Sequence, residues 1–188
     1  MAAVEANPRG IPKAPFVANV DEYQATETEA TLKKFQEMIA KYKYMENNNL
    51  QRKKSLESKI PEIKKTLDMV NFLISKEDSD EPIQTQYELS DTLWATAKIK
   101  STDTVNLWLG ANVMLQYTTA EAKDLLISKL SAAKVSLTQV DEDLEFLREQ
   151  ITTMEVNTAR VYNHDVKLRR LAKAQKQAAG GGDEEERD

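Results

Sequence analysis

The chain has 188 residues, no cysteine and a formal net charge of −5 at pH 7, with 30% charged and 6% aromatic residues. The negative charge disfavours a general affinity for nucleic acid or anionic membranes, and the lack of cysteine excludes disulfides, thiolate metal sites and cysteine nucleophiles. The first residues lack the pattern of a signal peptide and no apolar run approaches the roughly 20 residues that span a bilayer, so we expect a soluble intracellular protein.

Residues 1–25 are predicted to form a proline-containing leader. The prolines restrict the backbone against helix, and Gly10 supplies a turn. A mobile, flexible leader is the simpler interpretation. The leader also carries four apolar residues: Ile11, Phe16, Val17 and Val20. The alternative is therefore that these side chains dock on a partner or on the nearby helix.

A long helix is predicted over residues 26–76. Thr26 and Glu29 have the spacing of a capping box, which satisfies free backbone donors at a helix start. Apolar residues then recur at alternating intervals of three and four, as in a coiled-coil seam. Pro61 lies inside this pattern without shifting its phase, so we expect one continuous helix kinked near that residue. The seam is interrupted by three polar residues: Glu46, Asn49 and Lys53.

Between residues 83 and 118 the apolar period changes to two, which predicts strands. Two β-hairpins fit, one turning near residues 90–92 and the other at residues 110–112, where Gly110 gives backbone freedom. Short hairpins are marginal unless another surface covers their apolar face. We therefore expect this segment to assemble with other chains. Burial of Trp94 and Trp108 in that assembly is favoured over an aromatic ligand cage.

A second long helix is predicted over residues 119–173, beginning at a capping box of Thr118 and Glu121. Its seam is almost wholly apolar. Residues 174–188, which end in GGGDEEERD, are predicted to be a disordered acidic tail.

The two helices flank the strands in the sequence, so they are expected to pair antiparallel, with partner numbers that sum to about 200. The polar interruption of the first seam then faces Leu147, Ile151 and Met154, in the half of the coil remote from the strands. Long charged side chains can fold over such apolar groups. Alternatively, the coil is loosely closed there and offers apolar surface to another molecule.

The sequence shows no catalytic or metal-binding pattern. The glycines do not form a phosphate-binding loop, and His164 is the only histidine, without a cysteine partner. The acidic runs lack the spacing of a calcium site. Basic runs at residues 52–54 and 167–176 fit solvated faces, with contact to an acidic partner or client as the alternative. We expect no enzyme activity, no cofactor and no bound metal.

Three stretches resemble the α-type subunits of prefoldin: KYKYMENNNLQRKKSLESKIPEIKKTLDMV, VNLWLGANVMLQY and DLEFLREQITTMEVNTARVYNHDVK. The likeness covers nearly all of residues 10–170, and the order of helix, two hairpins and helix is that of the family. The resemblance implies a mainly α fold, a long antiparallel coiled-coil hairpin whose two central β-hairpins join a β-barrel between subunits.

The resemblance also implies partners. An α-type subunit would join one further α-type and four β-type prefoldin subunits in a hexamer. The family captures unfolded actin and tubulin at the coil tips and delivers them to the cytosolic chaperonin without ATP, and it involves neither nucleic acid nor membrane. The alternative, from a different functional class, is a coiled-coil scaffold or tether without holdase activity.

The resemblance finally implies two sets of site residues. Subunit assembly would use the strand segment, through Leu93, Trp94, Val105, Leu107, Trp108, Leu109, Gly110, Val113 and Leu115. Contact with clients or the chaperonin would use the coil end remote from the strands, through Leu32, Phe35, Ile39, Tyr42, Met45, Met154, Val161 and Leu168.

Overall fold

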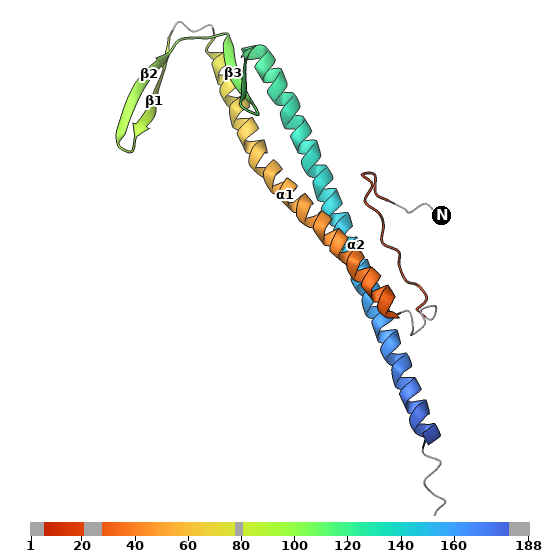
Figure 1. Cartoon of the computed structure of the whole chain (residues 1–188). Coiled ribbons are helices and arrows are strands. Elements are labelled where there is room, and N and C mark those ends of the chain that lie inside the picture. Colours follow the sequence, from red (N-terminus) through yellow and green to blue (C-terminus); the bar gives the residue numbers. More distant parts are fainter. Residues whose placement is uncertain (1–5, 21–27, 78–80, 181–188) are drawn as a thin grey trace, which may run out of the picture. The chain divides into compact units, whose positions relative to one another are not determined.

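The computed structural model describes residues 6–20, 28–77 and 81–180 (Figure 1). In chain order it contains helix α1 (Thr28–Ser75), strands β1 (Ile83–Ser90), β2 (Leu93–Ile99), β3 (Thr104–Gly110) and β4 (Val113–Thr118), and helix α2 (Thr119–Gly180). The chain forms two compact units. Residues 1–52 and 140–188 make up the first, called here the coil unit, and residues 53–139 make up the second, called the strand unit.

Helix α1 continues through Pro61 without a break. The apolar seam keeps its phase across this residue, so tertiary contacts on both sides can offset the loss of one backbone hydrogen bond. Thr26, half of the first predicted capping box, lies outside the described residues. Glu29 is in the first turn of the helix, where a negative charge interacts favourably with the helix dipole.

The strands form two separate antiparallel hairpins, β1 with β2 and β3 with β4. Their turns fall where the sequence predicts them. In the second hairpin Ala111 and Asn112 have positive φ angles of 48° and 61°, as a tight turn with the twist of its flanking strands requires. The predicted class, a mainly α coiled-coil hairpin with two central β-hairpins, is thus confirmed.

Helix α2 begins at the predicted capping box. The Thr118 backbone N–H donates to Glu121 Oε2 at 3.1 Å, and the Glu121 N–H donates to Thr118 Oγ1 at 3.2 Å. The helix ends at Gly180, so residues 174–180 belong to it, and their prediction as part of a disordered tail is wrong. Alanine, glutamine and lysine fill this stretch, and their high helix propensity outweighs the polar composition. Residues 181–188 lie outside the described part.

Residues 6–20 of the leader, called here the docked leader, pack against the helices of the coil unit. Gly10, with a φ of 83°, forms a turn closed by a hydrogen bond from its N–H to the Asn7 carbonyl at 2.9 Å. Ile11, Ala14 and Val17 are then buried. For these residues the structure shows docking on the chain's own helices, and not the mobile leader that the sequence favoured.

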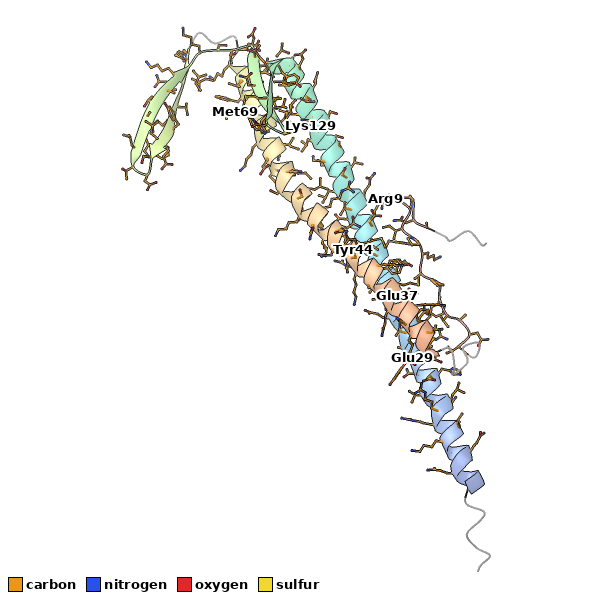
Figure 2. The ribbon with its side chains drawn as sticks, viewed as in Figure 1. Arg9, Glu29, Glu37, Tyr44, Met69 and Lys129 are labelled. Atoms are coloured by element: carbon orange, nitrogen blue, oxygen red, sulfur yellow. The ribbon has the colours of Figure 1, made fainter. Side chains whose placement is uncertain are left out.

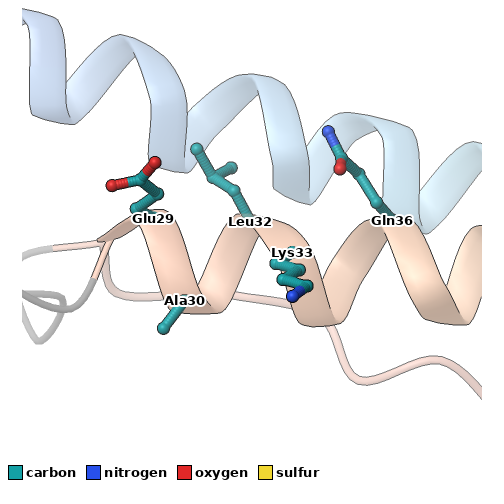
Figure 3. A pocket seen from close by; sticks show the side chains of 5 residues that line it. All are labelled: Glu29, Ala30, Leu32, Lys33 and Gln36. Carbon is teal, nitrogen blue, oxygen red and sulfur yellow. The ribbon is translucent and has the colours of Figure 1, made fainter.

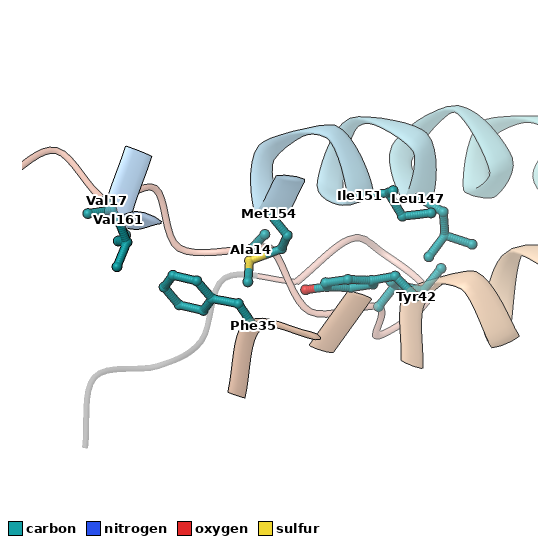
Figure 4. Close-up of a cluster of buried hydrophobic side chains, with 9 residues drawn as sticks. Ala14, Val17, Phe35, Tyr42, Leu147, Ile151, Met154 and Val161 are labelled. Atoms are coloured by element: carbon teal, nitrogen blue, oxygen red, sulfur yellow. The ribbon is translucent and has the colours of Figure 1, made fainter. Parts of the chain in front are cut away.

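The core of the coil unit contains side chains from the docked leader, α1 and α2 (Figure 4). Its buried members are Ile11, Ala14, Val17, Phe35, Tyr42, Leu147, Ile151, Met154 and Val161. Ion pairs join Lys43 to Glu155 at 3.4 Å and Glu46 to Arg148 at 3.5 Å. The paired numbers sum to slightly under ~200, as antiparallel pairing of the helices predicts.

The core of the strand unit joins the β3–β4 hairpin to the helices. Its buried members are Val70 of α1, Leu107 of β3, and Ala122 and Leu126 of α2. Because side chains alternate between the faces of a strand, Val105 and Leu109 lie on the same face of β3 as Leu107, and both are partly buried against this core. The chain's own helices therefore cover this face of β3, while Leu115, the partner of Leu107 on β4, stays 48% exposed.

Candidate docking surfaces on the strands and the coil

The strand unit exposes large apolar side chains. Trp94 and Trp108 are 58% and 59% exposed, and Leu93 is 58% exposed. Further exposed apolar residues on the strands are Tyr87, Leu89, Ile99, Val113, Met114 and Leu115. Exposed apolar side chains in this number are typical of a surface that contacts another protein.

The strands also offer unpaired backbone groups. Each sheet consists of two strands only, so every strand has one edge whose N–H and C=O groups make no ladder within its sheet. Such edges are templates for pairing with another chain. Exposed edges and exposed apolar faces together suit this segment to assembly.

The structure divides the predicted assembly residues into two groups. Leu93, Trp94, Trp108, Val113 and Leu115 are exposed and available to another subunit. Leu107 is buried in its own chain, so its assignment to contact with other subunits needs correction. Val105 and Leu109 are partly buried beside it, and their contact with other subunits stays a prediction. The period of two predicts the strands correctly, but it does not tell which strand face the chain's own helices cover. Gly110 has a φ of 99° at the second turn, where it shapes the hairpin.

The predicted client-contact residues lie mostly inside the coil unit. Phe35, Tyr42, Met154 and Val161 are members of its buried core, and Leu32, Ile39 and Met45 pack partly buried against it. Leu168 is partly buried. In the conformation described here, the four buried side chains are closed to any other molecule.

Small open surfaces remain on α1. Leu32 lines a shallow pocket together with Glu29, Ala30, Lys33 and Gln36 (Figure 3). Met45 lines a second one with Ala40, Lys41 and Tyr44. Tyr44 is 70% exposed, and in the strand unit Met69 is 58% exposed (Figure 2). These are scattered side chains, and single exposed apolar residues are common on folded proteins.

The docked leader is held by polar side chains of α2 that the sequence reading missed. Asp143, Gln150 and Asn157 are buried, with 7%, 5% and 0% of their surface exposed. They recur every seventh residue, directly before Leu144, Ile151 and Thr158 of the seam. A polar residue repeated with the coiled-coil period beside an apolar seam is a visible signal, although it does not tell what the residues bind.

Each of these three residues bonds the leader. Gln150 Oε1 accepts from the Ala14 N–H at 2.9 Å, and Asn157 Oδ1 accepts from the Val17 N–H at 3.0 Å. Asn157 Nδ2 donates to the Pro15 carbonyl at 2.7 Å. Buried amide side chains thus pair with buried main-chain groups, which removes the cost of leaving either unsatisfied.

Charged and aromatic contacts hold the two ends of the docked leader. Arg9 Nε donates to Asp143 Oδ1 at 2.6 Å, and its NH1 donates to Glu142 at 2.9 Å; the bond to Asp143 is the main cause that raises the Arg9 pKa. At the other end the Arg160 guanidinium lies 5.0 Å from the centre of the Phe16 ring.

Tyr42 of α1 contacts the middle of the docked leader. Its hydroxyl donates to the Pro12 carbonyl at 3.0 Å. Burial raises the pKa of Tyr42 above its usual value, because the ionised phenolate is disfavoured away from water. The neutral, donating form is therefore the one that holds the leader.

Two other classes of site find no support in the described ranges. Within residues 6–20, 28–77 and 81–180, no three histidine or carboxylate side chains gather as metal ligands would. In the same part of the chain, neither helix has a stretch apolar and long enough to cross a membrane.

Comparisons with known proteins agree with the architecture. A family model described as prefoldin subunit matches residues 42–164. Prefoldin subunit 3 of Elsinoe fawcettii is 60% identical over 166 residues, which cover 87% of this chain and 84% of that protein. Prefoldin subunit 3 of Homo sapiens is 49% identical over 164 residues, which cover 85% of this chain and 83% of that protein.

A solved structure supports the fold alone. A chain of the filamentous PFD of Methanocaldococcus jannaschii, determined by cryo-EM, matches with a TM-score of 0.51 and 13% identity, over 64% of this chain and 98% of that chain. The order of helices and hairpins, the exposed strand faces and the sequence relatives lead to one conclusion: the chain belongs to the prefoldin subunit family.

Proposed function

We propose that this chain assembles through its strand unit with one further α-type and four β-type subunits into a hexameric prefoldin. The observation that carries the proposal is the exposed apolar surface of the hairpins, with Trp94 and Trp108 more than half exposed. Burying such surface is the main favourable term in association. The unpaired strand edges would add main-chain hydrogen bonds across the subunit boundary.

The assembled complex would act as a passive co-chaperone in the cytoplasm. Several coils that each bind an unfolded chain weakly give useful avidity together, without any energy source. The family likeness implies clients of the actin and tubulin class, which the complex would deliver to the cytosolic chaperonin without ATP. The residues Leu32, Phe35, Ile39, Tyr42, Met45, Met154, Val161 and Leu168 remain our proposed contact set, and the four buried ones require a change of conformation first.

The test is co-expression of the chain with β-type and α-type prefoldin subunits, followed by size-exclusion chromatography and an aggregation assay with unfolded actin. We expect one complex with the mass of a hexamer, which suppresses aggregation equally with and without ATP. Failure to form the complex, or protection only with ATP, would refute the proposal.

The second candidate is a scaffold or tether without holdase activity. The closed core of the coil unit favours it, because Leu147, Met154 and Val161 are almost completely buried and leave little apolar surface for a client. The same aggregation assay separates the two functions. An intact hexamer that never protects actin would identify the scaffold.

A further inference from the structure

The surface of the coil unit that holds the docked leader, called here the groove, includes Tyr42, Gln150 and Asn157. We propose that this groove is a binding site for extended apolar peptide segments, and that the leader occupies it in place of an unfolded client. This inference rests on the proposed holdase function and names where the client segment lies. The bound leader shows the chemistry of the ligand that the groove fits.

The amides of α2 that bond the leader have a regular spacing along the helix. Gln150 and Asn157 stand seven residues apart on α2, a rise of about 10.5 Å along the helix. The backbone N–H groups that they bind belong to Ala14 and Val17, three residues apart, and three residues of extended chain span about 10 Å. The distance between successive bonding positions is therefore about the same on the helix and on an extended peptide that runs parallel to it.

The contacts in the groove depend little on the sequence of the bound peptide. The polar contacts of Gln150 and Asn157 go to main-chain N–H and C=O groups, which every peptide except at proline provides. The apolar contacts take one side chain in three, from Ile11, Ala14 and Val17, and a repeat of three is that of the polyproline II conformation common in unfolded chains. Such a groove recognises extended conformation and apolar spacing without reading a particular sequence.

The leader packs in the same buried cluster as residues expected to contact clients. Phe35, Tyr42, Met154 and Val161 belong to the same buried cluster as the three leader side chains. If clients bind these residues, the leader and the client compete for one surface. Docking buries one alanine and two β-branched side chains while it orders the backbone, and Phe16 stays 58% exposed, so the apolar gain from docking is small and is opposed by the lost chain entropy.

Carboxylates lie at the upstream end of the groove. Arg9 pairs with both Glu142 and Asp143, two residues before the first buried apolar side chain of the leader. The upstream end of the groove is therefore acidic. Extended segments with a basic residue shortly before an apolar repeat should bind in preference to acidic segments.

The direct test measures binding of a fluorescein-labelled peptide of residues 6–20 to the full-length chain by fluorescence polarisation. The double variant Ile11→Asp, Val17→Asp should release the leader and leave every groove residue intact. Since the chain's own leader no longer competes for the groove, we expect the peptide to bind the variant at least ~10-fold more tightly than it binds the wild type. Retained helical circular dichroism shows that the coil is folded.

Two controls locate the binding. Adding Asn157→Leu to the released variant should weaken peptide binding about 10-fold or more, because two main-chain groups lose their partner. Asn163→Leu, at an exposed position of α2, should leave it unchanged. Equal affinity of wild type and released variant, or no effect of Asn157→Leu, would overturn the proposal.

A second arm identifies the occupant. A carboxymethylated, permanently unfolded protein should displace the labelled peptide. The assembled complex that carries the released variant should suppress actin aggregation at a lower concentration than the wild-type complex. If the complex protects actin but neither leader release nor Asn157→Leu changes that protection, the client binds elsewhere and only this inference fails. If no variant protects actin, the holdase function itself fails.

The oligomeric state of the wild type tests a different occupant. A dimer that forms with rising concentration and is abolished by Ile11→Asp, Val17→Asp would assign the groove to the leader of a second copy.

Discussion

The coil unit and the strand unit meet the same physical demand in opposite ways. In the coil unit Leu147 and Met154 are fully buried, in part by residues of the leader that lie far from them in sequence. In the strand unit Trp94 and Trp108 stay more than half exposed. Exposure of many apolar side chains to water is unfavourable. The coil unit buries its apolar side chains with residues of its own chain, whereas the strand unit leaves apolar side chains exposed that other chains can bury.

The largest effect expected from this contrast is on assembly. Trp108→Glu should prevent formation of the complex with co-expressed prefoldin subunits, because burying an unpaired carboxylate in an apolar interface is very unfavourable. Helical circular dichroism should stay unchanged. Chromatography with light scattering gives the mass, and Ser131→Glu, at an exposed position of α2, is the matched control that should assemble. Normal assembly of the Trp108 variant would show that this residue does not lie in the interface.

The next effect is on the stability of the isolated chain. Leu147 is completely buried and Leu115 is 48% exposed. Leu147→Ala should lower the free energy of unfolding by about 2–5 kcal/mol, the usual cost of a cavity in a core. Leu115→Ala should change it by less than about 1 kcal/mol. Urea titration of both variants measures the difference, and equal losses would contradict the division into a closed and an open unit.

A smaller effect concerns pH and the docked leader. Because the pKa of Tyr42 is raised by burial, the folded state favours the neutral phenol. Its contribution to stability is complete below the unfolded pKa of about 10 and is lost as pH rises through the folded value. Above about pH 10 the methyl NMR signals of Val17 should move toward unfolded positions.

Tyr42→Phe is the control for this titration. The variant lacks the hydrogen bond to Pro12, worth about 0.5–1.5 kcal/mol, and should hold the leader less firmly at neutral pH. It should also lose the part of the alkaline transition that comes from the phenol. An identical transition in the variant would assign the pH response to other groups.

The smallest effect is that of the ion pairs of Arg9. Arg9→Gln should raise the amide exchange rates of Ala14 and Val17 at low salt, because the anchor to Asp143 and Glu142 is lost. The difference from the wild type should shrink at high salt, since partly exposed pairs are screened. Lys43→Gln, which removes a coil ion pair outside the leader, should leave these rates unchanged. A salt-independent difference would point to packing of the arginine stem instead.

Much of the architecture could be predicted from local patterns. The alternation of three and four located both helices, the period of two located the strands, and the spacing of Thr118 and Glu121 placed the start of α2. The second hairpin turn was visible in Gly110 and its neighbours. In each case the signal lies within a few residues of the structure that it specifies, because helices and hairpins are defined by short-range hydrogen bonds.

The candidate sites were less visible. The sequence marked Trp94 and Trp108 as interface residues, and both are exposed in the single chain. It also assigned Leu107 to the interface and Phe35, Tyr42, Met154 and Val161 to client contact, whereas all five are buried within the chain. An apolar side chain satisfies the same pattern whether its cover comes from its own chain or from another molecule.

The sequence by itself determined the elements, their order and the family. Only the tertiary structure decided what covers each apolar face: the leader over the coil unit, and the helices over one face of β3. Gln150 and Asn157 bind residues more than ~100 positions away in the chain, and no local periodicity specifies such contacts. They form because the packed helices bring buried amides and an extended peptide to matching spacings, a property of the assembled fold.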